Sequence, residues 1–203
     1  MIELHKLSVS RRGTVLAAID QLVVHSGQKL MLTGGNGSGK TTLLRVIAGL
    51  EKDYAGQRKV ETPPGKTTFL HQEPILFHGD VLSNLTYGLR ARGIPAEQRL
   101  KRAREIAGQL QIGSLLEKGS RSLSGGEKKK IALARALVLN PALLLLDEPF
   151  ADLDDRFTDR LVGLLLQSES VTVVVTSPKW ESRFEIFDRF ELQAPALEND
   201  SPG

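Results

Sequence analysis

The feature that most constrains the fold of this chain is a glycine-rich segment that joins a strand pattern to a helix pattern. The segment consists of Gly34, Gly35, Asn36, Gly37, Ser38, Gly39, Lys40 and Thr41, and it satisfies the pattern G-x-x-x-x-G-K-[ST]. A short apolar run at residues 29–33 precedes it, and apolar residues recur at helical spacing over residues 43–50. The sequence therefore predicts a loop that leads from a buried strand directly into the start of a helix.

A loop of this kind can bind phosphate. Its glycines allow several backbone N–H groups to point inward, and the dipole of the following helix favours an anion at the helix N-terminus. Lys40 would reach the β- and γ-phosphates of a nucleotide, the hydroxyl of Thr41 would bind Mg²⁺, and Thr42 completes the predicted binding residues. The alternative, a flexible glycine turn, does not explain the strand before the loop and the helix after it. By itself the motif predicts only the P-loop class of nucleoside triphosphatases.

Two acidic residues follow another apolar run. Residues 143–146 are four leucines, and Asp147 and Glu148 come directly after them. Ligands of open α/β sheets bind at the C-terminal ends of the strands. We therefore expect Asp147 to bind Mg²⁺ and Glu148 to act as the general base that deprotonates an attacking water. The alternative is a pair of ordinary surface acids.

The remaining pattern predicts an α/β domain. Residues 2–9 alternate apolar and polar side chains, whereas residues 143–146 and 171–175 are continuous apolar runs. Continuous runs separated by helical segments are typical of a mostly parallel sheet that is buried on both faces. Helix-forming and basic residues over 80–117 indicate a helical insertion between the strands.

The composition argues against several functional classes. A chain of 203 residues with 40% hydrophobic and 25% charged residues fits one globular domain. Its formal net charge of +3 is spread along the chain, so nucleic acid is not an expected partner. Its apolar stretches are shorter than the roughly 18–20 residues that cross a bilayer, and its N-terminus lacks a signal-peptide core. We therefore expect a chain without its own membrane span.

A second glycine motif indicates the family. Leu123 is followed by Ser124, Gly125, Gly126 and Glu127, with a capping box between Ser124 and Glu127 at a helix start. One nucleotide cannot easily use two anion-binding helix starts of one chain. The motif set resembles that of the ABC ATPases over residues 2–190. In that family the LSGGE motif of one subunit closes over the γ-phosphate held by the P-loop of the other subunit.

The resemblance implies an architecture and further site residues. It implies a P-loop NTPase with a mostly parallel central sheet, a small N-terminal antiparallel β-subdomain and a helical subdomain at about residues 80–135 that carries the signature motif. This ATP-binding domain would span residues 1–190, with 191–203 a polar C-terminal tail. By the same resemblance, Gln72 is the glutamine that contacts Mg²⁺ and the water, and Asp152 belongs to the loop that crosses the dimer interface.

Three parts of the sequence depart from the family pattern. Ser177 stands where the family has a catalytic histidine, and a serine would need a water or a loop shift to reach the γ-phosphate. Arg11 or Arg12 stands where an aromatic residue stacks on adenine, and a guanidinium can stack on the base or remain solvated. Lysines occupy 128–130, where the family often has Gln and Arg. These lysines either form an ordinary solvent-exposed face of the helix or add positive charge near the signature motif.

The resemblance also implies partners. We expect ATP and Mg²⁺ as ligands, a second copy of the chain in a homodimer, integral membrane permease subunits, a solute-binding protein, and a place at the cytoplasmic face of the cell membrane. Apolar side chains within residues 75–87 would dock the permease, and this stretch resembles importers of oxyanions such as tungstate or molybdate. The alternatives are an ABC ATPase of a soluble assembly machine and a weakly catalytic, nucleotide-gated module suggested by Ser177.

Overall fold

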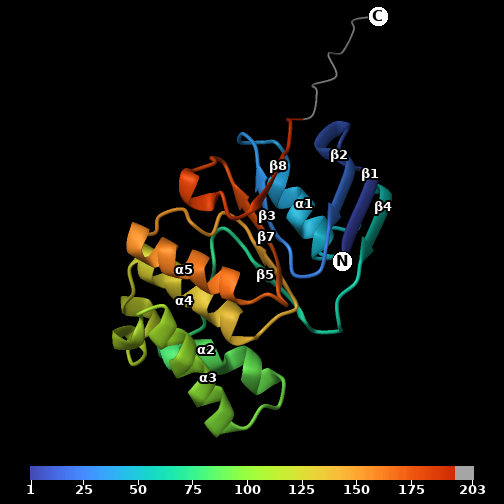
Figure 1. Ribbon diagram of the computed structural model, residues 1–203. Helices are drawn as coiled ribbons and strands as arrows, with labels where there is room; N and C mark the ends of the chain where they lie inside the picture. The colour runs from blue at the N-terminus through green and yellow to red at the C-terminus, as the bar shows by residue number, and fades with distance from the viewer. Residues whose placement is uncertain (195–203) are drawn as a thin grey trace, which may run out of the picture.

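The computed structural model describes residues 1–194 and centres on a five-stranded sheet with the strand order β5-β6-β7-β3-β8 (Figure 1). Its strands are β3 (Lys29–Thr33), β5 (Thr67–Leu70), β6 (Leu143–Leu146), β7 (Thr172–Ser177) and β8 (Asp188–Glu191). Every neighbouring pair in this sheet is parallel. The predicted α/β class with a parallel central sheet is confirmed.

The strands of this sheet send alternate side chains into two separate cores. Leu144, Leu146 and Val175 pack with the helices of one face, whereas Leu143 and Leu145 pack with the helix and sheet of the other face. Because successive side chains of a strand point to opposite faces, a run of leucines fills both cores at once. This explains why β6 and β7 are continuously apolar in the sequence.

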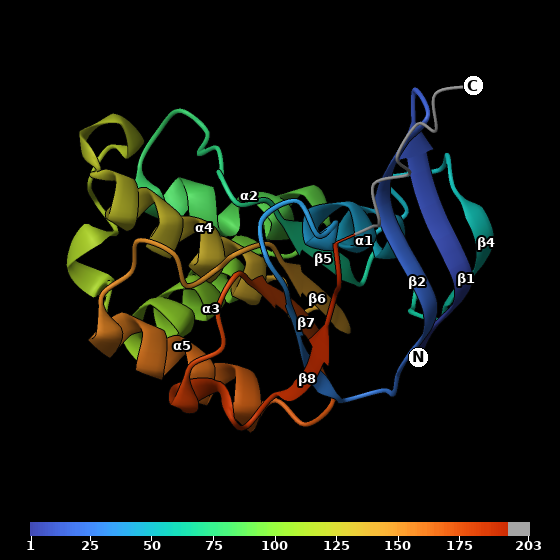
Figure 2. The ribbon, with the colours of Figure 1, turned by 90° about the horizontal axis from the view of Figure 1, so that it is seen from above.

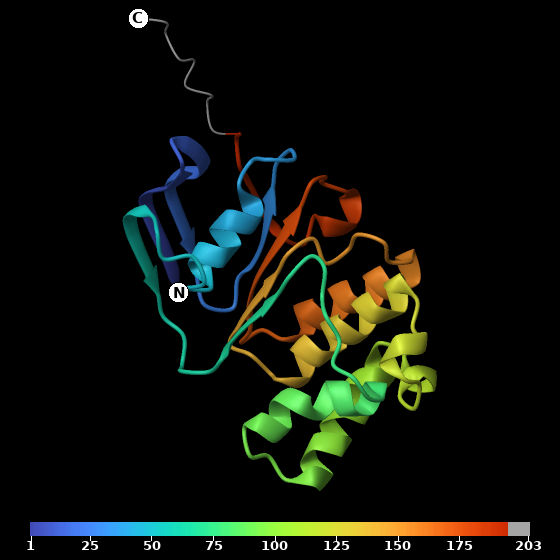
Figure 3. The ribbon, with the colours of Figure 1, turned by 180° about the vertical axis from the view of Figure 1, so that it is seen from behind.

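A second, antiparallel sheet covers one face. It has the order β2-β1-β4 and consists of β1 (Ile2–Arg11), β2 (Thr14–Val24) and β4 (Ala55–Val60). Helix α1 (Lys40–Ile47) lies between this sheet and the parallel sheet, as Figures 2 and 3 show. Leu4 and Val9 of β1 share a buried cluster with Leu43 and Leu44 of α1. The predicted N-terminal antiparallel subdomain is confirmed, and its core holds α1 in place.

Helices cover the other face. They are α2 (Val81–Ala91), α3 (Ala96–Gln109), α4 (Gly125–Val138) and α5 (Asp155–Gln167), with 3₁₀ turns at Gly113–Leu115, Ser120–Ser122 and Ser182–Phe184. Helices α4 and α5 pack near the sheet, and α2 and α3 lie outside α4 (Figure 1). Among the described residues, no helix is long and apolar enough to cross a membrane.

The ends of the predicted segments differ slightly from the elements. The helical insertion predicted for about 80–135 begins one residue before α2, and α4 continues to Val138. The parallel sheet continues to Glu191 in β8, and Leu192 is still buried in the core. Residues 195–203 of the predicted tail lie outside the described residues.

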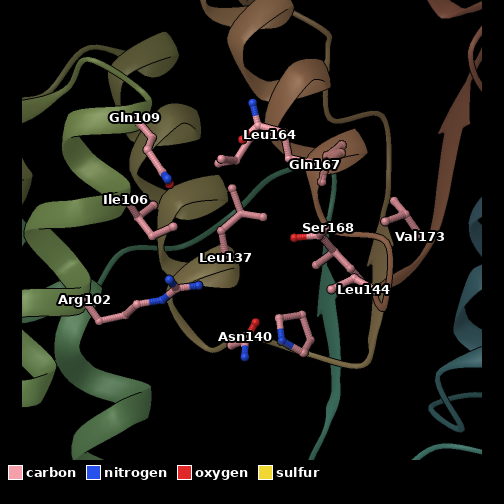
Figure 4. Close-up of a pocket in the computed structure, with 13 residues that line it drawn as sticks. Arg102, Ile106, Gln109, Leu137, Asn140, Leu144, Leu164, Gln167, Ser168 and Val173 are labelled. Atoms are coloured by element: carbon pink, nitrogen blue, oxygen red, sulfur yellow. The ribbon is translucent and has the colours of Figure 1, made fainter. Parts of the chain in front are cut away.

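A cavity of about 240 Å³ lies near the N-terminal ends of β6 and β7 (Figure 4). Arg102 and Ile106 of α3 line one side, and Leu144 of β6 and Val173 of β7 lie on the other. None of the residues predicted to bind a nucleotide lines this cavity. The predicted metal ligand Asp147 and the predicted base Glu148 instead follow the opposite, C-terminal end of β6.

Arg58 joins the antiparallel sheet to α1. It lies in β4, and its Nε donates to the carbonyl oxygen of Val46 at 2.7 Å while its Nη2 donates to that of Ile47 at 2.8 Å. These carbonyls belong to the last turn of α1, where the regular N–H partners of the helix are missing, and that of Val46 also accepts from the N–H of Gly49 at 2.9 Å. A cation at a helix C-terminus is also favoured by the helix dipole.

Replacing Arg58 by Met is expected to lower the free energy of unfolding by about 2–4 kcal/mol, because two charge-assisted hydrogen bonds are lost. Urea denaturation followed by circular dichroism measures the change. Lys59→Met is the matched control, since Lys59 is exposed and pairs only with the exposed Glu61. Equal stability of the two variants would contradict this role of Arg58.

Candidate phosphate-binding site

The glycine-rich loop runs from the end of β3 to the start of α1. Gly39, the N-cap of α1, has φ +89°, and a Cβ there would lie 2.5 Å from the carbonyl oxygen of Leu16. Gly34 has φ +147°, and its Cβ would lie 2.4 Å from the carbonyl oxygen of Leu192. Both the backbone conformation and the available space therefore require glycine at these two positions.

Lys40 is buried at the base of this loop. Its Nζ donates to the carbonyl oxygens of Gly34 at 2.8 Å and Gly35 at 2.9 Å. Burial lowers the pKa of Lys40, and the nearby carboxylates of Glu148 and Asp147 act in the opposite direction. The ammonium thus contacts neutral carbonyl oxygens, and an anionic phosphate would be a stronger acceptor for the same donors.

Asp147 follows β6 and links three elements. Its Oδ1 accepts hydrogen bonds from the hydroxyl of Thr41 in α1 at 3.0 Å and from that of Thr176 in β7 at 2.8 Å. Its Oδ2 is buried without a partner among the described residues. An unpaired carboxylate oxygen beside a threonine hydroxyl is a set of hard oxygen donors, which Mg²⁺ prefers. These residues fit the predicted metal.

Glu148 lies beside Asp147 in a left-handed conformation, with φ +45°. Its backbone N–H donates to Thr176 Oγ1 at 2.8 Å, and its Oε2 accepts from Nε2 of Gln72 at 2.8 Å. The same hydroxyl of Thr176 therefore serves both acidic residues. This arrangement turns the Glu148 side chain towards the glycine loop rather than back along the strand.

The loop, the glutamine and the glutamate surround one hollow of about 450 Å³. Its lining residues are Leu16, Asn36, Gly37, Gly39, Lys40, Thr41, Thr42, Gln72 and Glu148. The structure thus brings the predicted loop residues together with Gln72 and Glu148, although they are far apart in sequence. Asp147 is not among the lining residues, but it accepts a hydrogen bond from Thr41, which is one of them. The hollow thus combines the glycine-rich loop predicted to bind phosphate, oxygen atoms that could bind a metal, and a candidate general base.

The predicted signature residues lie elsewhere in the chain. Ser124 and Glu127 form the predicted capping box at the start of α4: the Ser124 side chain accepts from the Glu127 N–H, and the Glu127 side chain accepts from the Ser124 N–H. Neither these residues nor Gly125 and Gly126 are among those that line the hollow in the described chain. The second glycine motif is therefore not part of the same site within one chain.

Three other predicted site residues have local partners. The Arg11 guanidinium forms an ion pair with Glu51. The Ser177 hydroxyl donates to the carbonyl oxygen of Lys179 at 2.6 Å and accepts from the Lys179 N–H at 3.2 Å. Asp152 is exposed and has φ +61°. Contacts of these residues with a nucleotide remain predictions.

Sequence reasoning missed two residues of the site. Thr176 is completely buried and hydrogen-bonds to both Asp147 and Glu148, whereas the sequence pattern predicted a role only for its neighbour Ser177. The sequence signal for Thr176 was a threonine directly after three consecutive valines of β7. Leu16 contributes the apolar wall of the hollow, and no sequence motif marks it. Ligand sites are commonly lined by apolar side chains of this kind.

Three comparisons with known proteins extend these observations. The ABC transporter family profile matches residues 19–151. The chain is 38% identical to the molybdate/tungstate import ATP-binding protein WtpC of Pyrococcus horikoshii over 80% of this chain and 49% of that protein. It is 35% identical to the sulfate/thiosulfate import ATP-binding protein CysA of Xanthomonas campestris over 91% of this chain and 62% of that protein. The chain thus spans about half the length of the curated relatives it matches.

A solved structure matches the fold over nearly the full length. It is an ATP-binding cassette in a dimeric post-hydrolysis state bound to ADP and phosphate, with a TM-score of 0.80 and 23% identity. The alignment covers 96% of this chain and 95% of that one. At this level of identity the match establishes a shared fold, including both sheets and the helical subdomain.

Replacing Thr176 by Val is expected to lower the free energy of unfolding by about 1–3 kcal/mol, because Val leaves the partly buried Glu148 N–H without its acceptor and the buried Asp147 Oδ1 without one of its donors. Chemical denaturation measures the change. The matched control is Thr68→Val in β5, since the Thr68 hydroxyl is buried and has no partner within residues 1–194, so its removal should cost nothing. If Thr68→Val were the more destabilising change, the bridging role of Thr176 would be wrong.

Proposed function

This chain belongs to the ABC transporter family, and from this premise we propose that it is an ATP-binding and ATP-hydrolysing subunit that works as a dimer. The observation that carries the proposal is the shared hollow. The glycine loop, Lys40, Gln72 and Glu148 line one space although they come from separate parts of the sequence. A purely binding site would not need a carboxylate held at the position of a general base.

ATP would bind with its phosphates on the glycine loop. The loop N–H groups and the N-terminus of α1 would donate hydrogen bonds to the phosphates. The ammonium of Lys40, which now donates to the carbonyl oxygens of Gly34 and Gly35, would donate to the γ-phosphate instead. The adenine base of ATP would lie against the side chain of Leu16, which lines the hollow. Leu16 offers apolar contact without a hydrogen bond to the base edge, so phosphate contacts dominate binding.

Thr41 and Asp147 would hold Mg²⁺, Thr41 through its hydroxyl and Asp147 through the carboxylate whose Oδ2 is unpaired. When bound, the ion neutralises negative charge on the β- and γ-phosphates. Thr176 keeps the Asp147 carboxylate in place through its hydrogen bond to Oδ1. The protein thus fixes the position of the metal ligand before any ligand binds, which reduces the reorganisation that catalysis requires.

Glu148 would accept the proton of the attacking water. Gln72 donates to its Oε2, which leaves Oε1 able to accept that proton. The amide of Gln72 also lines the hollow and can orient the water for in-line attack on the γ-phosphate. Thr176 holds the Glu148 backbone, and Gln72 holds one oxygen of its carboxylate.

A second copy of the chain would complete each site. The start of α4 presents Ser124, Gly125 and Gly126 at a helix N-terminus, which favours an anion, and these residues do not line the hollow of their own chain. In a head-to-tail homodimer they would close over the γ-phosphate bound by the partner. The dimeric cassette with the same fold supports this arrangement. Asp152 would lie at the interface between the two copies.

An exposed apolar surface next to Gln72 would bind permease subunits. Ile75 is 81% exposed and Phe77 is 45% exposed, and the Phe77 ring lies 4.2 Å from that of Tyr87. Large exposed apolar side chains in a group are typical of protein-binding sites. We propose that this surface places the subunit at the cytoplasmic face of a membrane, in an importer with a solute-binding protein. The two oxyanion-import relatives favour an oxyanion solute.

Glu148→Gln is expected to reduce steady-state ATP hydrolysis at saturating Mg²⁺ about a hundredfold or more, because the base is lost. Phosphate release measures turnover, and a fluorescent nucleotide measures binding, which should change by less than about threefold. Slow hydrolysis should also make the ATP-bound dimer observable by size-exclusion chromatography. Wild-type turnover that is equal to that of Glu148→Gln would contradict the proposed enzyme.

Ile75→Glu is expected to remove the interaction with a membrane subunit while leaving basal ATP hydrolysis unchanged. The measurement is co-purification from detergent-solubilised membranes of the native cells, with Leu50→Glu as the control at an exposed apolar residue (57%) outside this surface. An integral membrane protein retained by the wild type and by Leu50→Glu, but lost from Ile75→Glu, confirms the surface. Retention by all three would place the contact elsewhere, and recovery of only soluble proteins would favour a soluble assembly machine.

A further inference from the structure

The exposed apolar surface next to Gln72 lies on the loop of residues 71–80, which joins β5 to α2. Ile75 of this loop is 81% exposed and Phe77 is 45% exposed. A side chain as exposed as that of Ile75 makes few contacts that could fix its position. The arrangement of the surface therefore depends on what holds the backbone of the loop.

Asn84 of α2 pairs with the main chain of Phe77. Its Oδ1 accepts from the Phe77 N–H at 2.8 Å, and its Nδ2 donates to the carbonyl oxygens of Phe77 and Asp80, each at 3.0 Å. Only 1% of Asn84 is exposed. A buried amide that satisfies both backbone groups of one residue fixes that residue much as a neighbouring strand would.

Arg135 of α4 contacts the same loop. Its Nη2 donates to the carbonyl oxygen of Ile75 at 2.8 Å, and its Nη1 donates to Asn84 Oδ1 at 3.4 Å. Its Cζ lies 5.1 Å from the centre of the Phe77 ring. Within residues 1–194 no carboxylate forms an ion pair with Arg135. The guanidinium thus binds a loop carbonyl and an aromatic face, a combination that suits its planar shape.

These contacts give the surface a defined shape. The Phe77 ring lies 4.2 Å from that of Tyr87 in α2, and Ile75, Phe77 and Arg135 are among the residues that line a hollow of about 610 Å³. Asn84 and Arg135 come from two different helices, so the loop is fixed to both. A surface that is already ordered avoids the entropic cost of ordering a loop when a partner binds.

We propose that Asn84 and Arg135 are positioning residues that keep the 71–80 loop ready for its partner, and that Arg135 joins this surface directly to α4. The proposal rests on the proposed function of the surface in binding a membrane subunit. Neither residue needs to contact that subunit, because each acts through the backbone of Ile75 or Phe77. A partner that displaces these two residues would act on α4 through the contacts of Arg135.

The first test measures backbone hydrogen exchange of the purified chain by mass spectrometry and needs no partner. In Asn84→Leu we expect the amides of residues 73–79 to exchange about tenfold faster or more, because the Phe77 N–H loses its acceptor. In Arg135→Met we expect an increase of about threefold or more, because the Ile75 carbonyl and the Phe77 ring are released.

Arg99→Met is the matched control for this test. Arg99 of α3 is partly buried like Arg135, and its Nη1 donates to the carbonyl oxygen of Ile94 at the same distance of 2.8 Å. This variant should leave exchange at residues 73–79 unchanged. Unchanged exchange there in both Asn84→Leu and Arg135→Met, or an equal increase over the whole chain, would overturn the positioning role.

The second test is co-purification of an integral membrane protein from detergent-solubilised membranes of the native cells. We expect Asn84→Leu and Arg135→Met to recover about fivefold less of it than the wild type, although the side chains of Ile75 and Phe77 are unchanged. Arg135→Lys, which keeps a donor for the Ile75 carbonyl, should restore part of the loss, and Arg99→Met should match the wild type. Full recovery with Arg135→Met would show that the inference is wrong.

The two tests separate failure of this inference from failure of the proposed function. If the wild type recovers no membrane protein, the proposed partner is wrong, and exchange at residues 73–79 still decides whether Asn84 and Arg135 hold the loop. If exchange increases but every variant recovers the membrane protein, the partner is right and the positioning role is wrong. Asn84→Ala removes the same hydrogen bonds and replaces Asn84→Leu if that variant is recovered only as aggregate.

Discussion

The hydrogen bonds to Asp147 Oδ1 are the contacts on which the rest of the site depends. Thr41 donates from α1 and Thr176 donates from β7, so one carboxylate oxygen fixes the end of β6 to a helix on one side and to a strand on the other. The Glu148 N–H uses the same Thr176 hydroxyl. The distance between the phosphate-binding loop and the candidate base is thereby set by buried, short-range contacts rather than by flexible side chains.

The parts of the site that depend on local geometry could be predicted from the sequence. The loop at Gly34–Thr41 requires glycine for reasons of φ and space, so its pattern survives in the sequence as a motif. The capping box of Ser124 and Glu127 is formed by residues three positions apart. The parallel sheet followed from continuous apolar strands, because each of its faces is buried in a separate core. These features need no knowledge of long-range contacts.

The parts that depend on long-range contacts could not be predicted. Thr176 meets Asp147 only after β6 and β7 pair, and Leu16 reaches the hollow only because the antiparallel sheet covers α1. The pairing of Arg11 with Glu51 joins residues 40 positions apart. Lys128 is exposed whereas the adjacent Lys129 is buried, and this difference depends on which side of α4 is covered. Such contacts involve common residue types at positions with no fixed spacing.

Helix α1 has a further consequence, because both of its ends are bound. Its first turn carries the loop that would receive the phosphates, its last turn is held by Arg58 of β4, and its sides are enclosed by the two sheets. A helix of this length is about 12 Å long. It is a stiff connection between the nucleotide and the antiparallel sheet, so a small displacement of the loop would move that sheet as one body instead of being absorbed by bending.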